Sequence, residues 1–168
     1  DPDIAGFIAV RDVLTGQAVL QGAPLRIPGP GAASEAAGPR ALVLSPDSRF
    51  AYVLTSGRDA LGAPASWLHV VDTNTGREAA YPLALPGDAP AHAAHSLLHA
   101  SAGGVWAVTY SSALRTTHVT RASFERGTFA ISLLQALGDA PAPAHLALEE
   151  TNAPNGAAAV AVRDRVSI

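Results

Sequence analysis

The sequence predicts an all-β fold made of short antiparallel strands joined by tight turns. Short apolar runs rich in β-branched and aromatic residues, such as Phe50–Thr55 and Val105–Tyr110, recur along the chain. Turn-forming sequences such as Ser45–Ser48 separate these runs. No segment has a convincing helical pattern, because the alanine-rich stretch Ala93–Ala102 runs into two consecutive glycines.

The clearest unit runs from Arg40 to Glu78. Its first apolar run, Ala41–Leu44, is followed by the Ser45–Ser48 turn and the Phe50–Thr55 run. A third run covers Trp67–Val71, and a fourth strand is expected from Glu78. Three or four short strands with tight connections indicate one antiparallel meander.

A hairpin pattern occurs twice. The segments Ile8–Val19 and Leu68–Ala79 each read as a strand, a turn that begins with Asp and ends with Gly, and a second strand. The residues in register are Asp12 and Gly16 in the first copy and Asp72 and Gly76 in the second. A short Gly-Asp-Ala-Pro-Ala sequence also recurs, at 87–91 and 138–142. These matches predict an internal repeat.

Repeats of about 40–50 residues with four short strands each are typical of β-propeller blades. The Arg40–Glu78 unit resembles the repeat of YVTN-type propellers, which are related to WD-repeat propellers. The resemblance rests on Ser45–Ser48, where Ser48 replaces the usual Gly, on Tyr52-Val53, and on the segment Val71–Gly76. It is partial over Phe7–Val19 and weak beyond Gly87.

We therefore expect one all-β unit over residues 1–168, with blade-like pieces at about 7–20, 40–85, 95–134 and 146–168. The segment 22–39, rich in Gly and Pro, is expected to be a loop or insertion. About three blades would leave sheet edges open, since closed propellers have four to eight. The chain is thus expected to be part of a larger ring, completed by further sequence, a second chain or another copy of itself. The absence of Met favours a fragment or processed product. The alternative is a closed β-sandwich of eight to ten strands.

Composition limits the function classes. The net charge is −3 and no basic patch stands out, which argues against a nucleic-acid partner. No apolar run approaches the ~20 residues of a membrane helix, so membrane insertion is not expected. The chain has no cysteine, so disulfides and thiolate metal sites are excluded. Only 15% of residues are charged, which hints that part of the surface is covered.

Metal-capable side chains cluster at one place in the sequence, at His92, His95 and His99, with Asp88 nearby. Their spacing matches no zinc motif, and on a strand only His95 and His99 would share a face. We therefore expect no metal or cofactor and take these histidines as strand-edge or loop residues. His145 follows the second Gly-Asp-Ala-Pro-Ala copy at a similar place, which favours a structural role.

The acidic residues in turns are predicted to be structural. A carboxylate at the start of a turn accepts backbone N–H groups two residues on, which is the role expected of Asp12, Asp47 and Asp72. Trp67 and Trp106 are expected in the core, with a ligand-stacking platform as the alternative. No serine has the Gly-x-Ser-x-Gly context of a nucleophile.

These observations favour a non-enzymatic interaction or scaffold module that binds protein partners or the remaining blades. Its contacts are expected in the loops 22–39 and 57–66, because loops on a rigid scaffold recognise partners. The residues expected to make these contacts are Pro28, Pro30, Gly57, Arg58, Asp59 and Leu61. The resemblance also implies two alternatives: part of a lactonase-like or quinoprotein-like enzyme, with the His92–His99 cluster facing the channel, or a structural propeller at a surface or in the periplasm.

Overall fold

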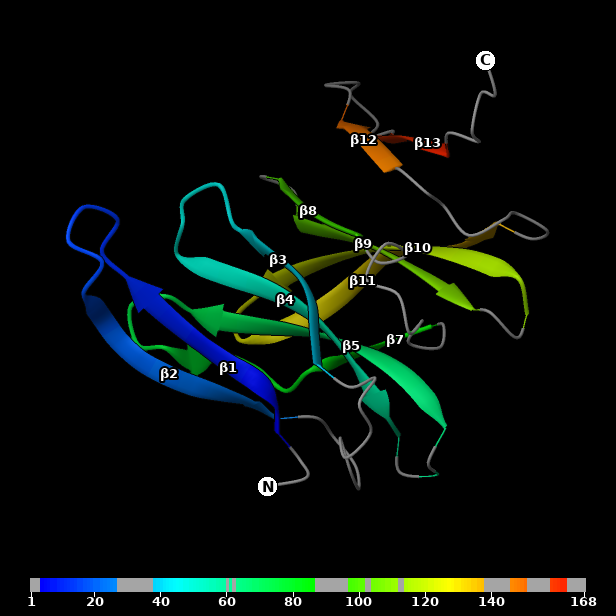
Figure 1. The fold of residues 1–168 in the computed structure, drawn as a ribbon. Helices are drawn as coiled ribbons and strands as arrows, with labels where there is room; N and C mark the ends of the chain where they lie inside the picture. The colour runs from blue at the N-terminus through cyan, green and yellow to red at the C-terminus, as the bar shows by residue number, and fades with distance from the viewer. Residues whose placement is uncertain are drawn as a thin grey trace, which may run out of the picture.

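A computed structural model describes residues 4–26, 38–59, 61, 63–86, 97–101, 104–111, 114–137, 146–150 and 158–162. Every regular element in these ranges is a strand, as the sequence predicts (Figure 1). The strands are β1 (Ile4–Arg11), β2 (Ala18–Arg26), β3 (Gly38–Leu44), β4 (Phe50–Arg58), β5 (Pro64–Asp72), β6 (Arg77–Glu78), β7 (Leu83–Leu85), β8 (Leu97–Ser101), β9 (Gly104–Ser111), β10 (Thr116–Glu125), β11 (Thr128–Leu137), β12 (Leu146–Glu150) and β13 (Ala158–Val162).

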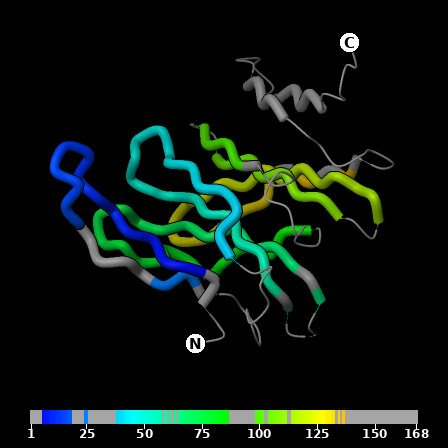
Figure 2. The backbone as a smooth tube through the Cα atoms, in the orientation of Figure 1, coloured from blue at the N-terminus to red at the C-terminus, as the bar shows by residue number. Residues whose placement is uncertain are grey.

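The strands form four antiparallel sheets. Sheet 1 is the β1–β2 hairpin, and sheet 4 is the β12–β13 hairpin. Sheet 2 has the order β3-β4-β5-β6, with β7 also pairing β5. Sheet 3 has the order β8-β9-β10-β11. Apart from β7, each larger sheet is therefore a meander in which strands that follow one another in sequence pair with one another, as Figure 2 shows along the colour gradient of the backbone.

Sheet 2 lies between sheets 1 and 3 and is buried on both faces. Successive side chains of a strand point to opposite faces. On β4 and β5, Tyr52, Leu54, Leu68 and Val70 face sheet 3, where they pack with Val105, Ala107 and Ala122. On the other face, Ala51, Val53 and Val71 pack with Ile8 and Leu25 of sheet 1. A strand buried on both faces needs a continuous apolar run, which explains why β4 and β5 show no clean polar alternation.

The central strands of sheet 3 are also buried on both faces. Val105 and Ala107 point toward sheet 2, whereas Trp106 and Val108 point to the opposite face, and all four are at most 3% exposed. The two tryptophans predicted in the core, Trp67 and Trp106, are each 3% exposed.

The outer face of sheet 1 is different. Ile8 points into the core, and strand alternation puts its neighbour Phe7, which is 66% exposed, on the other face of β1. Phe7 also borders a hollow of about 250 Å³ that it shares with Pro39 and Leu42 of β3. A phenylalanine ring on a two-stranded ribbon therefore stays open to solvent at this side of the stack.

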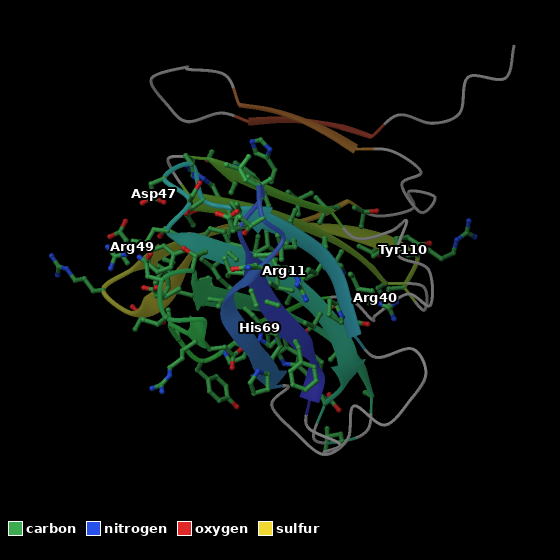
Figure 3. The ribbon with its side chains drawn as sticks, turned by 60° about the vertical axis from the view of Figure 1, so that its left-hand side comes forward. Arg11, Arg40, Asp47, Arg49, His69 and Tyr110 are labelled. Carbon is green, nitrogen blue, oxygen red and sulfur yellow. The ribbon has the colours of Figure 1, made fainter. Side chains whose placement is uncertain are left out.

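The connections gather at two ends of the stack. The β3–β4 turn, the β8–β9 turn and the end of β10 line one cleft, so they lie at the same end, which we call the turn end. The β4–β5 and β9–β10 connections must then lie at the opposite end, which we call the loop end. Figure 3 shows Asp47 and Arg49 on one side of the molecule and Arg40 and Tyr110 on the other.

Several strand boundaries differ from the sequence-based expectation. The segment 22–39 was expected to be a loop, but Gly22–Arg26 belong to β2, where Leu25 pairs Gly6, and Gly38–Pro39 belong to β3. Ile4–Gly6 likewise extend β1 before Phe7. Backbone pairing with a partner strand overrides the low strand preference of Gly and Pro at these places. Residues 27–37 lie outside the described part.

No helix among the described residues is long and apolar enough to cross a membrane.

Candidate functional site

The histidines singled out in the sequence do not form a described site. His99 lies on β8, where it pairs Trp106 of β9 and is partly buried. His92, His95, Asp88 and His145 lie outside the described residues. Within the described part, no three His, Asp or Glu side chains are grouped closely enough to hold a metal ion.

The turns at Asp12 and Asp72 have the same geometry. Asp12 Oδ1 accepts the amides of Leu14 at 3.0 Å and Thr15 at 2.7 Å. Sixty residues later, Asp72 Oδ1 accepts the amides of Asn74 at 2.9 Å and Thr75 at 3.1 Å. Each turn closes with a glycine, Gly16 or Gly76, at φ 68° whose N–H donates to the carbonyl of the Asp. Both aspartates thus organise backbone, as expected from the sequence.

Asp47 organises the β3–β4 turn in a similar way. Its Oδ1 accepts the Ser45 hydroxyl at 2.6 Å and the Arg49 amide at 3.1 Å. These hydrogen bonds hold the pKa of Asp47 below its ordinary value of 3.8, and the one from Ser45 has the largest effect. Asp47 is therefore a carboxylate at neutral pH.

The expected contact loop at 57–66 is shorter than predicted. Gly57 pairs Ala65 and Arg58 pairs Pro64, so both residues are strand and Gly57 is buried. The connection itself is held by Asp59, whose Oδ1 accepts the amides of Leu61 and Ala63, each at 2.9 Å. Leu61 is left 92% exposed. Pro28 and Pro30 lie outside the described residues.

A second exposed leucine lies at the same end. Leu114, in the β9–β10 connection, is 70% exposed, and its amide donates to the Ser111 hydroxyl at 3.3 Å. The sequence analysis did not select Leu114. Its position could be found only once sheets 2 and 3 are placed side by side.

Sequence reasoning also missed a buried hydrogen-bonded row on β4, β5 and β6. His69 Nε2 lies 2.7 Å from the Thr55 hydroxyl, and His69 Nδ1 lies 2.5 Å from Glu78 Oε1. The side chain of His69 is fully buried and that of Glu78 is 20% exposed. The only signal in the sequence is a single titratable residue inside the apolar run Trp67–Val71.

A hydroxyl, an imidazole and a carboxylate in a row are the groups of a nucleophilic triad. Here Thr55 and His69 have no exposed surface, so a substrate could not reach the hydroxyl without the sheets separating. The row instead satisfies buried polar groups and links three strands of one sheet.

A cleft of about 390 Å³ lies at the turn end, between sheets 2 and 3. Its lining, which defines the turn-end cleft, comprises Ser45, Pro46, Asp47, Phe50, Tyr52, Ser101, Gly104, Ser123, Phe124 and Glu125. Gly104 has φ 131°, and a side chain there would run into the Ala122 carbonyl, so glycine keeps this wall close to β10.

The charges in the cleft are negative. Asp47 and Glu125 line it, and no lysine, arginine or histidine does so among the described residues. Burial raises the pKa of Tyr52 above its ordinary value of 10, and the negative charge of Asp47 raises it further. The Tyr52 hydroxyl is therefore protonated and can donate a hydrogen bond.

Two phenylalanines divide this cleft from a second hollow of about 380 Å³. The rings of Phe50 and Phe124 meet edge to face with centroids 5.2 Å apart. The second hollow is lined by Arg49, Asp72, Ala79, Arg126 and Gly127 together with the same two phenylalanines. The Arg49 guanidinium stands 5.0 Å from the centroid of the Phe50 ring. An aromatic pair thus separates an acidic hollow from one that holds two arginines.

No family model, curated protein or solved structure matches this chain.

Proposed function

We propose that this chain is a non-enzymatic interaction module built from propeller-type blades, and that it contacts a protein partner through its loop end. The observation that supports this proposal most directly is the exposure of Leu61 and Leu114, which lie in two connections at the same end of the stack. Isolated exposed leucines are ordinary, but two on connections at the same end of the stack offer apolar contact points to a partner.

The blade arrangement is supported by the way the sheets stack. Sheets 2 and 3 are meanders of comparable size packed face to face, and the central strands of each are buried on both faces. A two-layer sandwich leaves the outer face of each sheet to solvent, whereas blades in a ring cover one another in turn. The shared geometry of the Asp12 and Asp72 turns supports a repeated unit.

The open face of sheet 1 supports a further blade or partner on that side. Phe7 is 66% exposed beside the buried Ile8, so a neighbouring layer could cover apolar surface there. We propose that the remaining blades of a ring, or another copy of this chain, take this position.

The test compares two pairs of substitutions at opposite ends of the β strands. Leu61→Ser with Leu114→Ser removes the apolar side chains of the loop end. Val13→Ser with Leu14→Ser, in the β1–β2 turn, removes side chains that are 94% and 91% exposed and serves as the matched control. Both variants should keep the far-ultraviolet circular dichroism of the wild type.

The readout is crosslinking to neighbours in the source cells, followed by mass spectrometry. We expect the loop-end variant to lose wild-type crosslinked partners that the Val13/Leu14 variant retains. If the two variants keep the same partners as wild type, the loop end is not the contact surface and the proposal is wrong.

A further inference from the structure

We propose that the turn-end cleft is a binding site for an organic cation, an alkylammonium or guanidinium group such as the end of a lysine or arginine side chain. This site lies at the opposite end from Leu61 and Leu114 and does not depend on the proposed function of the loop end.

The first argument is the unused hydrogen-bonding capacity of the cleft. Tyr52 is 6% exposed, yet its hydroxyl makes no hydrogen bond to any residue that the structure describes. The hydroxyl itself is not one of the buried polar atoms without a partner, because it opens into the cleft. Because Tyr52 lines the cleft, a bound molecule or water would satisfy it from that side. The Ser123 hydroxyl offers a second such group, also without a hydrogen bond in the described part.

The second argument is charge. Asp47 and Glu125 stand in the lining, which contains no cation among the described residues, although Arg49 in the neighbouring hollow acts electrostatically on Asp47. Asp47 uses Oδ1 to hold its own turn, which leaves Oδ2 for a ligand. The side-chain carboxylate of Glu125 makes no hydrogen bond or ion pair within the described part of the chain. A cation that donates to these oxygens would form charge-assisted hydrogen bonds.

The third argument is the aromatic wall. A ring attracts cations at its face, and guanidinium groups stack on aromatic rings. In this protein Arg49 already places its guanidinium 5.0 Å from the Phe50 centroid, in the neighbouring hollow. Phe50 and Phe124 also line the acidic cleft, so they offer apolar surface to the stem of a cationic ligand there.

The volume of the cleft suits such a group. About 390 Å³ lies within the range of small-molecule sites and accommodates an arginine side chain with its flanking peptide groups.

The experiment titrates the 168-residue chain with three probes and follows backbone amide shifts by NMR. The probes are Nα-acetyl-arginine methylamide, its uncharged isostere Nα-acetyl-citrulline methylamide, and agmatine, a free guanidinium–amine. We expect the arginine probe to shift the amides of Asp47, Ser123 and Glu125. The citrulline probe should bind about tenfold more weakly, as judged from the same amide shifts. A stronger response to the arginine probe than to agmatine would identify a peptide-borne ligand, and the reverse a free amine.

Glu125→Gln tests the site without disturbing a described hydrogen bond of the carboxylate. We expect it to weaken binding of the arginine probe about tenfold. Asp59→Asn is the matched control, since it removes the same charge at the loop end and its amide oxygen can still accept the Leu61 and Ala63 amides. It should leave binding unchanged.

Three results would overturn the proposal: no shift of the cleft amides with either cationic probe, equal binding of the arginine and citrulline probes, or Glu125→Gln that binds like wild type. Because Glu125 is exposed and its backbone pairing with Thr128 does not involve the carboxylate, a folding defect would not mimic any of these results.

Discussion

The imidazole of His69 and the carboxylate of Glu78 meet at 2.5 Å across neighbouring strands of sheet 2. The other nitrogen of the ring is taken by the Thr55 hydroxyl at 2.7 Å, so both sides of a fully buried imidazole are hydrogen-bonded. Burying three polar side chains costs little free energy only when each has its hydrogen-bond partner. A single substitution in this row should therefore reduce stability.

Replacing His69 should therefore destabilise the fold. His69→Ala leaves a cavity and an unpaired Thr55 hydroxyl, and we expect the free energy of unfolding to fall by about 2–4 kcal/mol. Glu78→Gln keeps an amide oxygen opposite the ring and should cost about 1 kcal/mol. Urea unfolding measures both. Equal losses in the free energy of unfolding for the two variants would mean that the Glu78 carboxylate contributes more to stability than the packing of the His69 ring.

Ser48→Gly should stabilise the protein. Ser48 has φ 59°, a left-handed conformation that costs an L-residue about 1–2 kcal/mol and glycine almost nothing. Its hydrogen bonds use only the backbone, from its N–H to the Ser45 carbonyl and from Thr73 Oγ1 to its own carbonyl, so they survive the change. We expect a gain of about 0.5–1 kcal/mol, because the freer unfolded chain offsets part of it. A lower thermal midpoint than that of wild type would contradict this account of the turn.

Gly104→Ala and Gly16→Ala separate steric contact from backbone strain. Both glycines have positive φ, 131° and 68°. A Cβ at Gly104 would clash with the Ala122 carbonyl oxygen, whereas a Cβ at Gly16 meets nothing within 4 Å. We expect losses of about 3 kcal/mol or more at Gly104 and about 1 kcal/mol at Gly16. Chemical denaturation compares them; similar losses would show that β9 and β10 are not packed this closely at the turn.

Asp12 should make the β1–β2 turn sensitive to acid. The Thr15 amide, the Thr15 hydroxyl and the Leu14 amide hold the pKa of Asp12 below its ordinary value of 3.8 in the folded protein. A folded-state pKa below the unfolded one adds stability that is present above pH 3.8 and is lost as pH falls through the folded value. Titration of the side-chain carboxyl by NMR should give a midpoint below 3.8. Asp12→Asn should flatten the acid side of the stability curve, and an unchanged curve would contradict this role.

The sequence predicted the all-β class and the roles of its turn aspartates because both depend on local chemistry. The Asp12 and Asp72 turns are each set by five consecutive residues, so their hydrogen bonds follow from composition and order. Strand ends were less predictable. Gly57 and Arg58 suggest a loop, yet pairing with Ala65 and Pro64 extends β4 through both.

The buried row and the cleft depend on contacts between distant segments. His69 meets Thr55 and Glu78 only after β4, β5 and β6 take their register. The turn-end cleft brings Asp47 together with Glu125, 78 positions later, by stacking sheet 2 on sheet 3. No local pattern specifies which sheets stack, and this is why sequence reasoning found neither the buried row nor the cleft.

The most direct test of the blade arrangement is the solution mass of the chain, measured by light scattering over a range of concentrations. The exposed Phe7 face of sheet 1 predicts a β-rich species whose mass rises above 17.0 kDa with concentration, and Phe7→Lys should reduce this association while keeping the circular dichroism spectrum. A folded, β-rich monomer of 17.0 kDa at every concentration would show that sheet 1 needs no cover, and it would contradict the account.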